Sequence, residues 1–294
     1  MELRLLEIFC RVVEEGGFSQ AAESLNLTQP TVSIHIKTLE DALSTRLLDR
    51  LGRKVVPTKE GTILYRYAKE IVRLKEEASQ SLKEFGGSVQ GNLTIGASTI
   101  PGEYILPQKI AEFKRLYPGV FPSLTIADTE KISHMVLDGR VDIGVVGSTI
   151  KDKNLLPQKF VSDEIVLAAP SSFEKSRISR EELARMPLVV REKGSGTRME
   201  TERAIREAEI EPEELNIVAE MGSTQALVGA VRSGLGLAFM SRLAIKEYVK
   251  RKILKEVKIK GVVIERYFHI ITHSKRSPSP ATRKFRAFLL GKEV

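Results

Sequence analysis

The sequence holds a single cysteine, Cys10, among 294 residues. One cysteine cannot form an internal disulfide, and without a cysteine cluster there is no zinc finger. Because apolar residues surround Cys10, packing in a core is expected rather than redox sensing. The sequence also lacks any apolar run near the roughly 18 residues that a membrane span requires, which argues against a membrane protein.

No targeting signal is expected from the first residues. Charged residues stand at positions 2, 4 and 7, which is too early for a signal peptide. The composition is that of an ordinary globular protein, 42% hydrophobic and 29% charged, and the length allows two or three domains with cores of their own. We therefore expect a soluble, cytoplasmic protein.

The net charge of +8 suggests a nucleic-acid partner without locating it. Residues 1–90 hold 13 basic and 13 acidic residues, a balance of zero. Residues 246–294 hold 14 basic and 4 acidic residues, a balance of +10. In this last segment the charges interleave with apolar residues, which is typical of a solvated face rather than of a second DNA site. Net charge therefore does not locate the DNA site, and the arrangement of the residues must do so.

Helical periodicity dominates the first 43 residues. Apolar positions recur at helical spacing over residues 3–15. A second, short helix is predicted over residues 20–25 with Ser19 as its cap, and a third runs to about residue 43 from Thr28, which can cap it. The third helix would bury Val32, Ile36 and Leu39 and turn Thr31, Ser33, His35, Lys37 and Thr38 outward.

Two helices joined by a short turn, with polar and basic groups facing outward from the second, suit the major groove of DNA. Spacing alone equally allows an ordinary helical hairpin. Residues 46–57 then resemble a basic β-ribbon with its turn at Gly52, whose side chains can reach phosphates beside the groove, and this favours DNA binding. The residues expected at the DNA are Thr28, Gln29, Pro30, Thr31, Ser33, His35, Lys37, Arg50, Arg53 and Lys54.

A long helix is predicted from Thr58 to about Phe85, followed by a hinge at residues 86–88. Its apolar residues step by three or four, which is the spacing of a coiled-coil seam. Two chains could pair along this seam, which comprises Leu64, Tyr67, Ile71, Leu74, Ala78, Leu82 and Phe85.

From residue 91 onward, strands alternate with helices. This alternation predicts a mostly parallel sheet with helices on both faces, and about 200 residues favour two lobes. The strands are expected at 92–97, 123–128, 141–146, 164–169, 187–190, 216–219, 236–240 and 266–272, and the helices at 103–117, 130–138, 179–184, 197–208, 224–233, 241–249 and 280–290.

Four strand-to-helix turns in this half are rich in serine, threonine and glycine. Hydroxyls and free N–H groups at helix N-termini bind anions, and ligands of open α/β sheets lie at the carboxyl ends of strands. Helix capping is the commoner role of such residues, but four turns, two in each lobe, favour a cleft. We expect a small anion or carboxylate to bind there, among Ser98, Thr99, Ser148, Gly196, Thr197 and Ser223.

Other signals carry no chemistry. The glycines of residues 234–239 lack the third glycine of a dinucleotide-binding loop. His134, His269 and His273 have no company that would form a metal site. No nucleophile, base or carboxylate pair is suitably spaced, so we expect no enzyme, no cofactor and no metal.

The chain closely resembles LysR-type transcriptional regulators in four segments, Phe18–Ser33, Leu39–Glu40, Leu47–Arg50 and Pro57–Gly61, and the rest of the chain resembles their effector domain. One departure is Ile34, where many members have arginine. Because of this departure, Ser33, His35 and Lys37 are the side chains expected to contact the DNA bases.

The resemblance implies an α/β multidomain protein with an N-terminal winged helix-turn-helix, a long linker helix that dimerises, and a two-lobed α/β effector-binding domain similar to type 2 periplasmic binding proteins. The expected divisions are 1–60, 58–88 and 91–294, with lobe I at 91–161 and 268–294, lobe II at 162–267, and crossovers near Val161–Ser162 and Arg266–Tyr267.

The resemblance also implies a homotetramer, built as a dimer of dimers, that binds double-stranded promoter DNA. An effector in the cleft would change lobe closure or subunit packing and so regulate transcription, with RNA polymerase as a further candidate partner. Two alternatives are a small-molecule-binding protein without a DNA role, against which the helix-turn-helix argues, and a phosphate-holding enzyme, against which the missing catalytic set argues.

Overall fold

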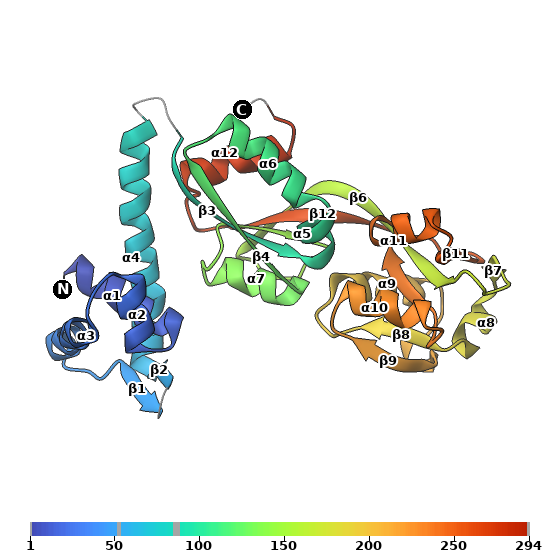
Figure 1. Cartoon of the computed structure of the whole chain (residues 1–294), viewed down its shortest axis with the longest axis horizontal. Helices are drawn as coiled ribbons and strands as arrows, with labels where there is room; N and C mark the ends of the chain where they lie inside the picture. The colour runs from blue at the N-terminus through green and yellow to red at the C-terminus, as the bar shows by residue number, and fades with distance from the viewer. Residues whose placement is uncertain (1, 52–53, 85–88, 293–294) are drawn as a thin grey trace. The chain divides into compact units, whose positions relative to one another are not determined.

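The computed structural model describes residues 2–51, 54–84 and 89–292. The chain forms two compact units, Met1–Gly87 and Ser88–Val294 (Figure 1). Within the described residues, no helix has the length and apolar character needed to cross a bilayer.

Three helices open the first unit, α1 (Leu3–Glu15), α2 (Phe18–Ser24) and α3 (Gln29–Leu43). The prediction for α1 is confirmed, and so is the cap of α3, because the Thr28 hydroxyl accepts a hydrogen bond from the Thr31 N–H. The prediction that Ser19 caps the second helix is wrong. Gly17 is the N-cap, and the helix begins at Phe18, which is buried in the core of this unit.

A β-hairpin follows, formed by β1 (Leu48–Leu51) and β2 (Lys54–Pro57) in antiparallel pairing. The Glu40 carboxylate at the end of α3 accepts hydrogen bonds from the backbone N–H groups of Leu47 at 2.7 Å and Leu48 at 3.2 Å. These bonds fix the hairpin against the helix, since a charged acceptor makes a stronger bond than a neutral one. The predicted turn residue Gly52 and its neighbour Arg53 lie outside the described residues.

Helix α4 (Lys59–Glu84) ends the unit and packs along α1. Its start is capped by the Thr58 hydroxyl, which accepts from the Gly61 N–H at 2.9 Å. Gly61 also permits a close approach, because a Cβ atom there would lie 2.0 Å from the Leu47 carbonyl oxygen.

Two sides of α4 carry apolar residues. Ala68 is fully buried, and Leu64 packs against the same core within the chain. Leu64 therefore already has intrachain partners. The side chain of Leu82, all of Phe85 and the predicted hinge at 86–88 lie outside the described residues. Exposed apolar residues on the helix are Ile63, Tyr67, Ile71 and Leu74.

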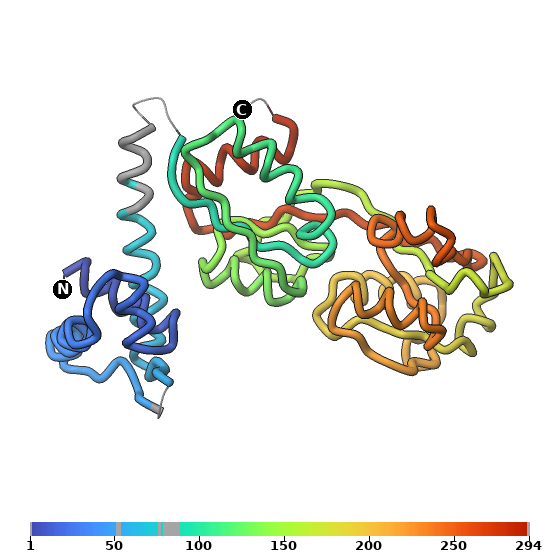
Figure 2. Tube along the Cα trace, in the orientation of Figure 1, coloured from blue at the N-terminus to red at the C-terminus, as the bar shows by residue number. Residues whose placement is uncertain are grey.

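The first lobe of the second unit has three parallel strands, β3 (Gly91–Ser98), β4 (Val120–Ala127) and β5 (Ile143–Val146), with β3 between the other two. The C-terminal helix α12 returns to pack on β3 and α6, as the red and green segments of Figure 2 show. The helices of this lobe are α5 (Thr99–Tyr104), α6 (Leu106–Leu116), α7 (Thr129–Leu137) and α12 (Pro280–Leu289).

Two long antiparallel strands, β6 (Leu155–Pro170) and β12 (Ile264–His273), run from the first lobe into the second. Tyr267 pairs with Ser162, and the register shifts between Tyr267 and His269. The two crossover points expected from the sequence are therefore neighbours across one ladder.

The second lobe adds a short parallel sheet of β8 and β9, with further strands bordering β6. Its strands are β7 (Arg177–Ile178), β8 (Leu188–Arg191), β9 (Ile217–Met221), β10 (Ala238–Ser241) and β11 (Leu254–Ile259). Its helices are α8 (Arg180–Arg185), α9 (Gly196–Glu207), α10 (Thr224–Arg232) and α11 (Arg242–Lys250), with a 3-10 turn η1 (Pro212–Glu214).

The prediction of a mostly parallel sheet is wrong at the centre of this unit. Strand β6 pairs antiparallel with β10, β11 and β12, because the chain enters the second lobe along β6 and returns along β12. Strands β7 and β11 and the first half of β6 are absent from the prediction. The helix expected at 103–117 begins at Thr99 and is interrupted at Ile105.

Candidate functional site

Helix α3 presents its predicted outward face to solvent. Lys37 is exposed, Ser33 and His35 are half-buried, and Ile34 is 64% exposed. A groove runs between this helix and β1, and its lining includes Ser33 and Lys37. Its basic members, Lys37, Arg46 and Arg50, suit a polyanion.

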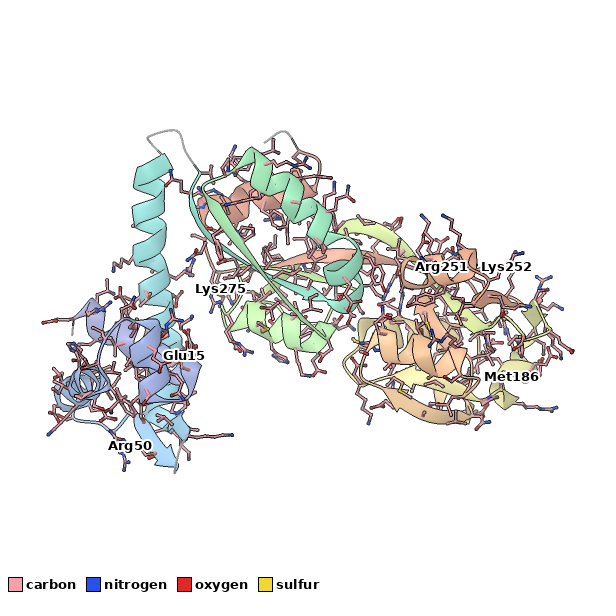
Figure 3. All side chains as sticks on the ribbon, in the orientation of Figure 1. Glu15, Arg50, Met186, Arg251, Lys252 and Lys275 are labelled. Carbon is pink, nitrogen blue, oxygen red and sulfur yellow. The ribbon has the colours of Figure 1, made fainter. Side chains whose placement is uncertain are left out.

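Of the other residues expected at DNA, Arg50 also lines this groove. Arg50 extends from the hairpin (Figure 3), and its guanidinium carbon lies 4.6 Å from the centre of the Phe18 ring, a cation–π contact. Gln29 donates to the Ser33 hydroxyl at 2.8 Å. Thr28, Pro30 and Lys54 are exposed and Thr31 is half-buried, whereas Arg53 lies outside the described residues.

In the second unit, a polar pocket lies where the carboxyl ends of strands from both lobes meet. Four of the six residues expected at a ligand line it, namely Ser98, Thr99, Gly196 and Thr197. The pocket is small, about 10 Å³, which is room for about one water molecule.

Ser148 and Ser223 do not line the pocket. The Ser148 hydroxyl, next to the lining residue Gly147, donates to Glu200 at 2.6 Å. Ser223 is exposed and caps α10 by accepting from the Ala226 N–H. The neighbouring Thr224 is buried, and it is this hydroxyl that faces the pocket's arginine.

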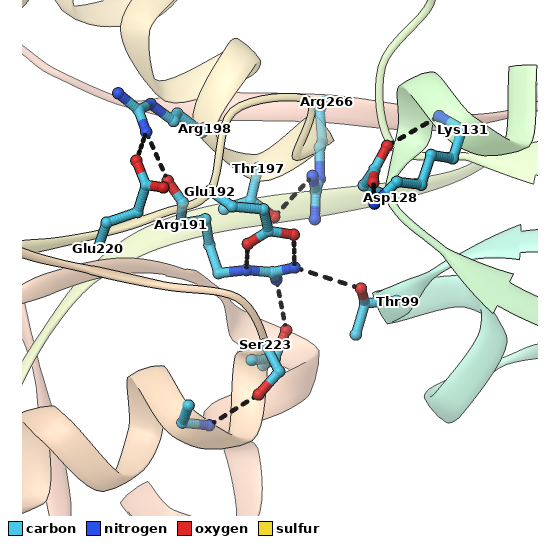
Figure 4. A network of polar contacts seen from close by, with 12 residues as sticks. Thr99, Asp128, Lys131, Arg191, Glu192, Thr197, Arg198, Glu220, Ser223 and Arg266 are labelled. Carbon is cyan, nitrogen blue, oxygen red and sulfur yellow. Dashed lines mark hydrogen bonds and ion pairs between the residues drawn. The ribbon is translucent and has the colours of Figure 1, made fainter.

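Arg191, at the end of β8, organises the pocket (Figure 4). Its guanidinium donates to Thr224 at 2.8 Å in the second lobe and to Thr99 at 3.4 Å in the first. It also forms a two-point ion pair with the Glu192 carboxylate, with both N–O distances at 2.7 Å. A carboxylate entering the pocket would compete with Glu192 for this guanidinium, because both present the same planar fork of acceptors.

Arg266 on β12 is the second buried cation. Its guanidinium donates to Asp163 on β6 and, at 3.2 Å, to the Thr197 hydroxyl at the start of α9. Burial lowers the pKa of Arg266, and the Asp163 carboxylate opposes that shift. The N–H groups of Arg266 Nη2 have no aligned acceptor, although this nitrogen lies 2.7 Å from Asp163 Oδ2.

The start of α9 sits against the start of α7. A Cβ atom on Gly196 would lie 2.5 Å from the Thr129 hydroxyl and 3.1 Å from the Ser148 backbone nitrogen. The Thr129 hydroxyl is buried, lines the pocket and has no hydrogen-bond partner in the part of the chain that the structure describes. A lining residue with an unsatisfied hydroxyl beside buried guanidinium groups is suited to a small polar ligand.

Acidic residues balance the pocket's cations. Asp128 lines the pocket, and although burial raises its pKa, hydrogen bonds from the Lys131 N–H and ammonium hold it below its usual value. The two lobes also touch at the rim, where Gln225 donates to the Tyr104 hydroxyl at 3.2 Å. The two lobes are therefore in contact around a pocket that leaves little free space and whose charged side chains are paired with one another.

The sequence reasoning missed Arg191 and Arg266, which carry the charge of this pocket. Arg191 directly follows a predicted apolar strand, and a cation at a strand's carboxyl end is a signal that could have found it. Arg266 gave no such signal, because only the pairing of β12 with β6 brings it beside Thr197.

Cys10 is 5% exposed in the first unit, and burial raises the pKa of its thiol to about 12. Among the residues that the structure describes, no group of three or more histidine, cysteine, aspartate or glutamate side chains could hold a metal ion.

A helix-turn-helix unit joined to a two-lobed α/β unit is the architecture of a transcriptional regulator with an effector domain. Residues 3–62 match the family of bacterial regulatory helix-turn-helix proteins of the lysR type, and residues 86–293 match the LysR substrate binding domain. The chain belongs to the LysR family of transcriptional regulators. Because these proteins are regulators, the expectation that the chain is no enzyme is confirmed.

Individual relatives agree with this membership. A probable RuBisCO transcriptional regulator of Guillardia theta is 35% identical over 286 residues, which are 95% of this chain and 92% of that one. The CcmR regulatory domain of Synechocystis PCC6803, solved in complex with 2-PG, is 25% identical with a TM-score of 0.63 and covers 69% of this chain and 97% of that one. Full-length CbnR complexed with its target DNA has a TM-score of 0.68 at 21% identity and covers 98% of this chain and 99% of that one.

Proposed function

We propose that the chain is a ligand-responsive regulator that binds promoter DNA through α3 and the β1–β2 hairpin and a small anion, such as a carboxylate, in the polar pocket. The observation that carries the proposal is the position of Arg191, which contacts hydroxyls of both lobes at once. The ligand held by the CcmR regulatory domain supports a small-molecule effector for this chain as well.

The effector would act by replacing Glu192 on Arg191. Freed of that ion pair, the Arg191 guanidinium would bind the anion, while Thr99 and Thr197 supply hydroxyls from the two lobes. The pocket must open to admit it, because its present space is about 10 Å³. An effector that prefers the opened arrangement shifts the balance between lobe positions, and one without a preference shifts nothing.

The two crossovers, near Val161–Ser162 and near Arg266–Tyr267, form the proposed hinge. Both lie on the paired strands β6 and β12, so bending at one strand moves the other. We further propose a homotetramer, built as a dimer of dimers in which the α4 helices of two chains pair. Closure of the lobes would change the spacing between the DNA-binding heads of this assembly. Residues 1–60, 58–88 and 91–294 would serve as head, linker and sensor, in contact with RNA polymerase at the promoter.

The DNA proposal is tested by gel shift on operator DNA selected from a random library. Lys37→Ala should weaken binding to every sequence. It should also reduce the slope of the logarithm of the binding constant against the logarithm of the salt concentration by about 1, the contribution of one phosphate contact. Ser33→Ala and His35→Ala should instead change the preference among operators. Lys284→Ala in the basic C-terminal segment is the charge-matched control, and equal loss in this variant would contradict the assignment to α3.

The effector proposal is tested by thermal shift against small carboxylates and phosphates, followed by calorimetric titration with the best binder. Thr99→Ala and Thr197→Ala should each weaken binding by roughly 1.5–3 kcal/mol, the value of a hydrogen bond to a charged group. Thr125→Ala, exposed on β4, should bind as the parent does. Undiminished affinity in the Thr99/Thr197 double variant would refute the pocket.

A further inference from the structure

A second cavity, of about 180 Å³, lies in the second lobe between α9 and the short β8–β9 sheet. Apolar side chains from three strands and the helix make up most of its wall, including Leu188, Val189, Ile205 and Phe239. All four are buried. A dry apolar cavity of about 150 Å³ is large enough for benzene, so this space fits one six-membered ring.

One polar atom in the wall lacks a partner. Thr201, on α9, is 7% exposed, and its hydroxyl makes no hydrogen bond to any described residue. A helical threonine commonly satisfies its hydroxyl on the carbonyl four residues earlier, and here that bond is absent. Leaving a buried hydroxyl unpaired costs free energy, so an occupant that hydrogen-bonds to Thr201 would remove a penalty as well as fill space.

The charged residues of the wall are already paired. Arg198 donates to Glu202 at 2.8 Å, to Glu220 at 2.6 Å and to the Arg191 carbonyl at 2.8 Å. Glu213 lies 3.3 Å from Arg206. An ionised ligand would therefore have to break one of these pairs, whereas a neutral ligand would leave them intact.

We propose that this cavity is a second ligand site. Its ligand is a neutral, mainly apolar molecule about the size of one six-membered ring. One hydroxyl or equivalent group of this molecule forms a hydrogen bond with Thr201. The site is separate from the polar pocket and does not depend on the proposed effector. Arg191 and Thr197 border both spaces, so an occupant here contacts the same helix, α9, that forms one wall of the polar pocket.

The first test titrates the full-length protein with phenol and with toluene, which share a ring and differ in the hydroxyl. The parent protein should bind phenol more tightly than toluene. Thr201→Val keeps the shape of the side chain and removes its hydroxyl, so phenol should bind about threefold to tenfold more weakly while toluene binds no worse. An unchanged phenol affinity, or an equal loss for both probes, would overturn the proposal.

The second test uses two neighbouring residues on β9 that are both 44% exposed, Ile217, which lines the cavity, and Val218, which does not. Ile217→Trp should fill the cavity and abolish phenol binding, and Val218→Trp should leave it intact. Because the chain contains no tryptophan, the new fluorophore reports its surroundings, with blue-shifted emission for Ile217→Trp only. Equal phenol binding by the two variants would refute the site.

Discussion

Arg266 and Asp163 face each other across the β6–β12 ladder as register partners and form an ion pair with 2.7 Å between Nη2 and Oδ2. Their side chains are 2% and 1% exposed. The pair lies beside the crossover between the lobes and is extended by Ser241, which donates to Asp163 at 2.8 Å, and by Thr197, which accepts from Arg266. It thus connects both long strands with β10 and with the start of α9.

Removing one member of this pair should be strongly destabilising. Asp163→Leu or Arg266→Met alone leaves a buried charge without its partner, and each should lower the free energy of unfolding by about 3–5 kcal/mol. The double variant should lose much less than the sum, because no uncompensated charge remains. Chemical unfolding of the four proteins, followed by far-UV circular dichroism, measures this. Additive losses would show that the two charges do not interact.

Gly196→Ala should wedge α9 away from α7. The added Cβ would overlap the Thr129 hydroxyl and crowd backbone atoms of Gly147 and Ser148, which cannot move independently. We expect a loss of stability and of effector affinity together. Gly229→Ala, inside α10 with nothing within 4 Å of the new Cβ, should instead stabilise the protein by about 0.5–1 kcal/mol. Thermal denaturation distinguishes the two, and equal effects would contradict the contact.

His269 should make stability depend on pH. Burial lowers the pKa of its imidazole from 6.5, and hydrogen bonding to Tyr267 opposes the shift only in part. A base with a lowered folded-state pKa takes up a proton on unfolding, so stability should be complete above about pH 6.5 and fall as the pH drops through that value. His269→Gln should flatten the melting temperature between pH 5 and 7. A variant with the parent's full slope would rule out this origin, and His134→Gln, on the exposed surface, serves as the control.

The exposed apolar residues of α4 predict an interface between chains. Ile71 and Leu74 are 39% and 51% exposed on a helix whose other side is packed on α1. Ile71→Asp with Leu74→Asp would bury charges at that interface, so the molar mass from light scattering should fall to that of a smaller assembly, and DNA binding should weaken. Val263→Asp, 74% exposed elsewhere, should keep the parent mass. An unchanged mass in the α4 variant would show that this side is not an interface.

Local rules were sufficient for much of the first unit. The apolar spacing of residues 3–15 and the capping of α3 by Thr28 depend on neighbours within a few positions, so these helices could be predicted from the sequence. The Ser19 cap failed because burying Phe18 in the core mattered more than a favourable capping residue. The pattern of residues 18–61 likewise identifies the class of protein, because the side chains that match the family are contiguous in the chain.

The polar pocket owes part of its composition to contacts between residues far apart in the chain. Ser98, Thr99, Gly196 and Thr197 could be expected there because each stands at or after the carboxyl end of a strand, where ligands of α/β sheets bind. Arg266 and Asp163 could not, because they are about a hundred residues apart and meet only through the antiparallel register of two crossover strands. The unsatisfied hydroxyls of Thr129 and Thr201 are also properties of packing, since nothing local to either residue leaves it without a partner.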